Sequence, residues 1–211
     1  PKQENRYELI KAYNSQSNGS LGAISNSSTA AHINFNGVFA SHYISYKLVI
    51  GWLNYFHGSN HSVNVRFLTG TNTELTGQYR WSIQRIDTTT DSYVGNNSTN
   101  DDRAQIFRQT NSGTNETNVG FHGELNFYNV GNVTIGGNST SVRFDSTADY
   151  APLVMGDLVG YDTASGGYVR ANSIGRYNVS NIDGYYTGFT VMGETGELAG
   201  THMALYGLRV S

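Results

Sequence analysis

Hydrophobic and polar residues alternate with a period of two in several segments of the chain after residue 31. In the segment SVNVRFLTG, Val63, Val65 and Phe67 share one face of a strand, and polar residues occupy the other face. The segment QYRWSIQRI repeats this pattern from residue 78 to 86. Such alternation is typical of strands with one buried face, so about ten short strands and almost no helix are expected.

Two segments are apolar on both faces, which is typical of a central strand. They are YKLVIGWLNYF at 46–56 and THMALYGLRV at 201–210. If the second segment inserts between earlier strands, the chain closes as a Greek key or jelly roll. We therefore predict an all-β fold, a two-sheet antiparallel β-sandwich that is jelly-roll-like. Gly207 is expected where a neighbouring side chain, such as an aromatic ring, presses against the backbone.

The alternating segments also predict which side chains form the core, because each must find a partner face. The same reasoning favours core packing for both tryptophans, Trp52 and Trp81. The predicted core consists of Ile33, Phe35, Leu48, Ile50, Val65, Phe67, Trp81, Ile83, Leu125, Phe127, Phe189, Val191, Met203 and Leu205.

Residues 1–30 differ from the rest and are expected to form a flexible N-terminal arm and linker before a sandwich domain at 31–211. The stretch ENRYELIKAY is long enough for one or two helical turns, and a Gly/Ser/Asn-rich linker follows it. Within the sandwich, the polar stretch 87–102 is expected to be a surface loop. The segment 150–180 has a different texture and is expected to be an inserted hairpin or excursion.

The apolar side chains of the arm need a cover, because its linker has too few apolar groups to offset the cost of ordering. We expect a partner protein to supply this cover when the arm docks during assembly. The predicted assembly residues are Tyr7, Leu9, Ile10 and Tyr13.

Composition narrows the classes of partner. Charged residues make up 14% of the chain, against about 25% in typical globular proteins, and the net charge is −3. No basic footprint for a nucleic acid is therefore present. The absence of cysteine removes disulfides and thiolate metal sites and is compatible with a reducing cytoplasm. No apolar run approaches the roughly 20 residues of a membrane helix, so membrane insertion is not expected.

Motifs that carry catalysis are absent from the sequence. It contains no GxSxG, HExxH, GxxxxGK[ST] or strand-borne GxGxxG pattern. His57 and His61 are four residues apart, but the segment FHGSNHS reads as a hairpin turn rather than a metal clip. We therefore expect no enzyme activity, no catalytic residues and no cofactor.

Acidic residues provide a weaker candidate for a metal site. The polar stretch contains four aspartates, whose carboxylate oxygens are suitable ligands for calcium. Their spacing matches no dedicated calcium loop, so a solvated loop is the preferred interpretation. Glu194 and Glu197 read as turn residues rather than as a glycosidase pair. No metal requirement is expected. The four aspartates are Asp87, Asp91, Asp101 and Asp102.

Exposed aromatic rings are the candidates for sugar binding, because their faces pack against the apolar faces of sugar rings. Tyr185 and Tyr186 are adjacent and must point to opposite faces of a strand, so at most one of them is in the core. The candidate glycan contacts are Tyr55, Tyr185 and Tyr186.

Five segments follow one another along the chain: HINFNGVFASHYISYKLVI, VNVRFLTG, GQYRW, GELNFYNV and YTGFTVMGETGELAGTHMALYGLR. Their order resembles a family of small β-sandwich modules from virion and tail proteins of tailed bacteriophages. That family's pattern has an I-x-F-x-G strand, a central Y-x-L-x-I strand, an x-R-F strand and a G-E-[LI]-x-F-Y-N strand. It ends on a G-x-[LIF]-x-x-G-x-[IMV]-x-L-Y-G hairpin. The similarity covers residues 32–130 and 185–210, whereas 131–184 matches poorly, so 150–180 is where this chain's own interface is expected. The matching residues are Ile33, Phe35, Gly37, Tyr46, Leu48, Ile50, Arg66, Phe67, Gly123, Glu124, Leu125, Phe127, Tyr128, Asn129, Gly196, Leu198, Gly200, Met203, Leu205, Tyr206 and Gly207.

The resemblance implies a non-enzymatic structural protein of a bacteriophage particle that acts by assembly, as a head decoration or a tail or fibre accessory. It implies a virion location after assembly in the bacterial cytoplasm, other virion proteins as partners, and a homo-oligomer. Two alternatives stay open. One is a carbohydrate-binding adhesin or receptor-binding module for a host-surface glycan. The other is a jelly-roll glycoside hydrolase or lyase, which the scarcity of paired acids disfavours.

Overall fold

The structure is a computed structural model, and its secondary structure consists of strands throughout the part of the chain that it describes. That part comprises residues 6–14, 32–56, 62–70, 73–88, 92–108, 120–130, 151–162, 167–178, 186–193 and 197–209. The strands are β1 (Arg6–Asn14), β2 (His32–Phe35), β3 (Tyr43–Phe56), β4 (Ser62–Thr69), β5 (Thr73–Glu74), β6 (Tyr79–Asp87), β7 (Ser92–Asp101), β8 (Ala104–Arg108), β9 (Gly120–Tyr128), β10 (Leu153–Asp162), β11 (Gly167–Tyr177), β12 (Tyr186–Gly193) and β13 (Glu197–Arg209).

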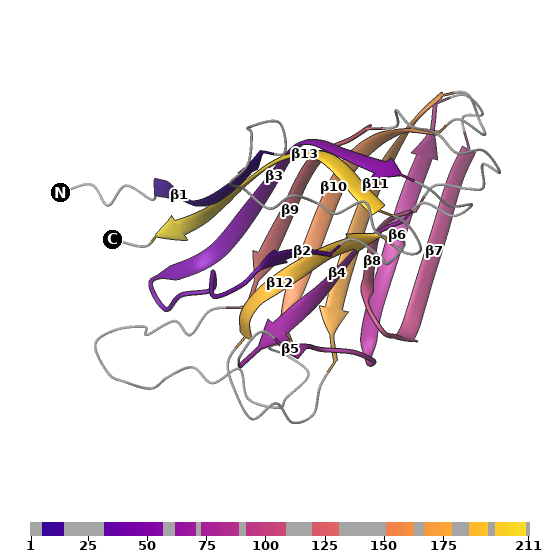
Figure 1. The fold of residues 1–211 in the computed structure, drawn as a ribbon. Coiled ribbons are helices and arrows are strands. Elements are labelled where there is room, and N and C mark those ends of the chain that lie inside the picture. Colours follow the sequence, from indigo (N-terminus) through magenta and orange to yellow (C-terminus); the bar gives the residue numbers. More distant parts are fainter. Residues whose placement is uncertain are drawn as a thin grey trace.

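These strands form two antiparallel sheets that pack face to face, so the predicted β-sandwich is confirmed (Figure 1). The large sheet has eight strands in the order β1-β13-β3-β9-β10-β11-β6-β7. The small sheet has the order β2-β12-β4-β5, and a fifth strand, β8, also pairs with β4. The face of the large sheet that packs on the small sheet is its inner face, and the opposite face is called the outer face below.

Phenylalanines from both sheets form the centre of the core. Phe127 in β9 of the large sheet stacks on Phe189 in β12 of the small sheet, with ring centroids 4.1 Å apart. Phe35 in β2 stacks on the same Phe189 ring at 4.5 Å, and Phe67 in β4 meets Phe127 edge-on at 6.3 Å. These rings join β9 to β2, β4 and β12, so they hold the sheets together.

The predicted core is confirmed in full. Each of its fourteen side chains is buried, and the most exposed of them is Trp81 at 9%. The inward and outward positions of β6 also match the prediction, because burial alternates strictly from Tyr79 to Asp87.

The last strand lies inside the large sheet, as its two apolar faces predicted. β13 pairs with β3 on one side and with β1 on the other. Gly207 in β13 lies against an aromatic ring, because a Cβ at this position would come within 2.5 Å of the Tyr43 ring. The prediction of a close aromatic neighbour at Gly207 is therefore confirmed.

The prediction of helical turns and a free arm at the N-terminus is wrong for Arg6–Asn14. This segment is β1, which pairs antiparallel with β13 from Arg6 opposite Arg209 to Asn14 opposite His202. A helix this short is marginal by itself, whereas pairing with β13 satisfies one row of backbone groups. The remainder of the predicted arm, 15–30, lies outside the described residues.

Two other predictions about segments need correction. The polar stretch expected to be a loop contains β7, which pairs with β6 at the edge of the large sheet. The residues of β7 have low β-propensity, but pairing with β6 on one side is enough to make this segment an edge strand. Its polar side chains can then stay in contact with solvent. The segment 150–180 does form a hairpin, but β10 and β11 are interior strands between β9 and β6 rather than an excursion.

A bulge in β3 explains why core packing of Trp52 was predicted wrongly. The register between β3 and β9 shifts between Ile50 and Leu53, both of which are buried. One extra residue in a strand moves the following side chains to the opposite face. Trp52 therefore lies on the outer face with 37% of its surface exposed.

We expect truncation of Phe127 to be strongly destabilising, because its ring packs directly against Phe189 of β12 and Phe67 of β4 in the small sheet. Phe127→Ala should lower the free energy of unfolding by about 3–5 kcal/mol in chemical denaturation. Thr99→Ala, at an exposed position of β7, is the control and should change it by less than about 0.5 kcal/mol. An unchanged denaturation midpoint for Phe127→Ala would contradict the packing of the two sheets.

Candidate functional site

The four predicted assembly residues divide between the core and the surface. Tyr13 packs edge-on against Phe35 at 4.7 Å, and its hydroxyl donates a hydrogen bond of 2.6 Å to the Asn34 carbonyl. Ile10 is also packed against the core. Tyr7 and Leu9, by contrast, are 52% and 59% exposed. Half of the predicted set is therefore covered by this chain itself.

The predicted glycan contacts do not come together as a platform in the described residues. Tyr185 and the side chain of Tyr55 lie outside the described residues. Tyr186 is half-buried, and its ring packs edge-on against Phe67 with centroids 5.8 Å apart. Burial raises the pKa of Tyr186 far above its usual value. Their role in sugar binding stays a prediction.

The four aspartates that were weighed as calcium ligands and interpreted as loop residues do not gather into one group in the described part of the chain. Asp87 is buried at the end of β6, and Asp91 lies outside the described residues. Asp101 accepts a 2.9 Å hydrogen bond from the indole Nε1 of Trp81, and Asp102 binds Arg66. In the described part of the chain, no three His, Asp or Glu side chains gather as metal ligands would. His57, His61, Glu194 and the side chain of Glu197 also lie outside it.

Asp102 belongs to a polar cluster on the small sheet that is centred on Arg66 of β4. The Arg66 guanidinium donates to Glu74 of β5 at 2.8 Å, to the Asp102 carboxylate, and to the Asp102 carbonyl at 3.0 Å. His32 of β2 contacts Glu74 at 2.7 Å through Nδ1, which must donate because a carboxylate accepts. The cluster thus ties together three strands and the β7–β8 turn.

The charges in the Arg66 cluster compensate one another. Burial alone would raise the pKa of Glu74, but hydrogen bonds from Arg66 and His32 and their positive charges outweigh it. The net result is a pKa of Glu74 below its usual value. Because every charged atom named here has a partner, the cluster is suited to fastening strands rather than to chemistry.

The outer face of the large sheet carries the exposed apolar side chains that the fold leaves without a covering layer in the described residues. Strand register aligns six of its side chains in one line across six strands, which we call the outer row. The outer row consists of Trp52 in β3, His122 in β9, Val159 in β10, Arg170 in β11, Ile86 in β6 and Tyr93 in β7.

Trp52 begins the outer row and lies directly on the sheet. A Cβ at Gly120 would come within 2.7 Å of two atoms of its six-membered ring, so the indole occupies the space above this glycine. The His122 ring stands edge-on to Trp52 at 4.9 Å. Since the Gly51 carbonyl can only accept, His122 donates its Nδ1–H to it, which leaves Nε2 as the ring's remaining hydrogen-bonding atom.

A second line of side chains runs beside the outer row, two residues along each strand, and we call it the polar row. It consists of Glu124 in β9, Asp157 in β10, Asn172 in β11 and Gln84 in β6. Both of its carboxylates are paired with cations.

The two carboxylate pairs differ in geometry. The Arg170 guanidinium donates two hydrogen bonds, of 3.0 and 2.7 Å, to the Asp157 carboxylate, while Lys47 donates one hydrogen bond of 3.0 Å to Glu124. The Lys47 hydrogen bond is the main cause of a Glu124 pKa below its usual value. Glu124 is therefore held ionised on the outer face.

Two tyrosines extend the apolar surface at the end of the β10–β11 hairpin. Tyr161 and Tyr168 are register partners, and their rings meet edge-on at 5.4 Å. Both are exposed. They lie two residues beyond Val159 and Arg170 on the same face of their strands.

The outer row is not recognisable from the sequence because its members are scattered from residue 52 to residue 170. Four of the six strands did contain a weak signal, which was a large apolar or aromatic residue at an outward position, whereas β9 and β11 contribute His122 and Arg170. Ile86 and Val159 are examples. Only the strand order and register bring such positions into one line.

Comparisons with known proteins give one weak likeness. No protein-family profile matches the chain, and no curated protein is similar to it. Among solved structures, a protein of unknown function from Bacteroides ovatus is 10% identical, with a TM-score of 0.21. The match covers 72% of this chain and 46% of that protein, so the chain spans less than half of its length. A TM-score this low carries no argument about function.

No helix that is long and apolar enough to cross a membrane occurs among the described residues.

The Arg66 cluster predicts a stability contribution that depends on pH. Because the pKa of Glu74 is lower in the folded state, its contribution is present above the usual glutamate pKa of about 4.3 and is lost as the pH falls through the folded value. Glu74→Gln and Arg66→Met should each weaken the fall in unfolding free energy between pH 6 and pH 3. Chemical denaturation at a series of pH values measures this. An identical pH dependence in the parent and both variants would contradict it.

Proposed function

We propose that this chain is a non-enzymatic structural protein that acts by assembly, and that copies of it join through the free edge of β7. The observation that carries the proposal is the contrast between the two edges of the large sheet. An edge strand presents unpaired backbone N–H and C=O groups, which are a template for pairing with another strand.

From Ser92 to Ser98 the β7 edge lacks the features that usually prevent such pairing. The β7 sequence SYVGNNSTND contains no Lys, Arg or Pro, and Asp101 at its end is its only charged residue. Its pairing with β6 is uninterrupted from Ser92 to Ser98, and the register shifts only beyond this stretch, between Ser98 and Asp101. In the described residues, no strand pairs with that edge.

The β1 edge at the other end of the large sheet is protected. Its register with β13 shifts between Leu9 and Lys11, which makes Ile10 an extra residue in the strand. Arg6 and Lys11 add positive charge to this edge. A bulge and charged side chains are two of the means by which natural sheets block edge pairing. The difference favours β7 as the edge that is kept available.

Pairing of β7 with β7 of a second copy gives a two-fold symmetric dimer with one sheet continuous across both copies. Such an interface is isologous, because the same residues contribute from each side. The side-chain amides of Asn96 and Asn97, near the middle of β7, can hydrogen-bond to the same residues of the second copy. From Ser92 to Asn100 the strand has no charged residue, so no like charges face each other across the interface there.

The resemblance to bacteriophage modules supplies the biological setting of this proposal. In that setting the protein is exposed on the virion as a head decoration or a tail or fibre accessory, with other virion proteins as partners. Mass spectrometry of separated heads and tails from purified particles tests the setting independently of the edge. Absence of the protein from purified particles would contradict it while leaving the edge pairing to its own test.

We expect lysines on β7 to abolish self-association, because two copies would then bring positive charges together at the edge. Sedimentation of the parent protein should show a concentration-dependent dimer, and the variant with Asn97→Lys and Thr99→Lys should remain a monomer. Ala12→Lys, at an exposed position of β1, is the matched control and should dimerise like the parent. A parent protein that stays monomeric, or a dimer unaffected by the β7 lysines, would contradict the proposal.

A further inference from the structure

We propose that the outer row and the polar row bind an extended, neutral, β-linked glycan that runs across the strands of the large sheet. This inference goes beyond assembly and does not depend on it. It rests on the side-by-side placement of a largely apolar line, interrupted by His122 and Arg170, and a hydrogen-bonding line on one exposed sheet face.

The outer row offers the apolar half of such a site. The pyranose rings of sugars with equatorial hydroxyls have apolar C–H faces that pack on flat aromatic and aliphatic surfaces. Trp52 lies over Gly120, Tyr93 is 62% exposed, and Val159 and Ile86 lie between them in the row. Aromatic side chains of this kind provide large contact areas at small cost in conformational entropy.

The polar row offers the other half. Glu124, Asp157, Asn172 and Gln84 carry planar groups with several hydrogen-bonding atoms each. A carboxylate has about four acceptor sites, so Asp157 retains acceptor capacity after binding Arg170. Sugar hydroxyls both donate and accept, so they can bind carboxylates, amides and the guanidinium alike.

The dimensions of the rows indicate a chain rather than a single sugar. Neighbouring strands are about 4.8 Å apart, so the six positions from Trp52 to Tyr93 span about 24 Å. The polar row is two residues along each strand, which is about 6.8 Å from the outer row. A glycan lying on the outer row therefore has its ring edges, where the hydroxyls are, within reach of the polar row.

The balance of charge selects a neutral glycan. Asp157 is neutralised by Arg170 and Glu124 by Lys47, so the rows present neither a basic patch for a polyanion nor an acidic one for a polycation. The same pairs disfavour a second protein as occupant of this face. A dry protein interface would have to desolvate both ion pairs, whereas sugar hydroxyls replace the water that they lose.

The experiment is affinity electrophoresis of the whole chain in gels that contain a soluble polysaccharide. The neutral probes are hydroxyethyl cellulose, mixed-linkage β-glucan and xylan, and the anionic probes are alginate and hyaluronan. We expect retardation by at least one neutral probe and none by the anionic probes. Retardation by no neutral probe, or by the anionic probes alone, would overturn the proposal.

Variants locate the binding on the rows. Trp52→Ala should weaken retardation about tenfold, which corresponds to ~1.4 kcal/mol of binding free energy. Asp157→Asn combined with Arg170→Gln should also weaken it, and it leaves Trp52 in place should the first variant fold poorly. Leu9→Ala removes an exposed apolar side chain from β1 on the same sheet, outside both rows, and is the matched control. Equal retardation of all variants would place any binding elsewhere and overturn the proposal.

Tryptophan fluorescence gives a second readout that separates this inference from assembly. In a Trp81→Phe background, Trp52 is the remaining tryptophan, and the retarding polysaccharide should shift its emission. The β7 lysine variant should show the same shift as a monomer, because its substitutions leave both rows unchanged. No shift at Trp52 would overturn the glycan site, while dimerisation through β7 would be unaffected by that result.

Discussion

The contact between Phe127 and Phe189 is the interaction on which the rest of the molecule depends. It joins the middle of the large sheet to the middle of the small sheet at 4.1 Å. Because side chains alternate along a strand, turning Phe127 inward turns its neighbour Asn126 outward, and the register carries this choice to Met155 and Ile174 on adjacent strands. The identity of every outer-face residue in the centre of the sheet thus follows from the packing of the core.

The alternation of apolar and polar residues was sufficient to predict the inward and outward side chains where a strand has one buried and one solvated face. β6 is the clearest case, since each of its predicted inward residues is buried. The pattern failed where the fold departs from strict alternation. At Trp52, a bulge between Ile50 and Leu53 reversed the faces. The local sign of this bulge is Gly51, because an isolated glycine within a strand pattern is typical of one.

Other errors arose because the stabilising partner is distant in the sequence. β1 looked helical in isolation, and its strand state depends on β13 at the opposite end of the chain. β7 has the composition of a loop and becomes a strand because β6 offers it a regular row of backbone partners from Ser92 to Ser98. The candidate site was invisible for the same reason, since the outer row draws single residues from six strands. The expectation that 150–180 carries this chain's own interface is nevertheless linked to the proposed site, because Val159 and Arg170 belong to that segment.

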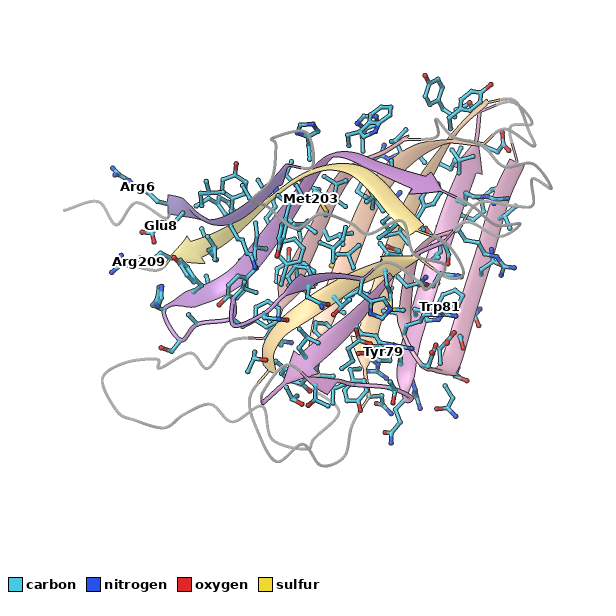
Figure 2. All side chains as sticks on the ribbon, viewed as in Figure 1. Arg6, Glu8, Tyr79, Trp81, Met203 and Arg209 are labelled. Carbon is cyan, nitrogen blue, oxygen red and sulfur yellow. The ribbon has the colours of Figure 1, made fainter. Side chains whose placement is uncertain are left out.

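The pairing of β1 with β13 also constrains how the protein is made. Glu8 and Arg209 are 201 positions apart in the chain, yet they form an ion pair at 3.3 Å at one corner of the sandwich (Figure 2). A ribosome adds about 5–20 residues per second, so β1 emerges roughly 10–40 s before its partner strand. During this interval the apolar side of β1, including Tyr13, has no β13 to lie beside. The large sheet consequently cannot close before β13 has been made, and among the described strands β1 is exposed to a nascent-chain chaperone for the longest time.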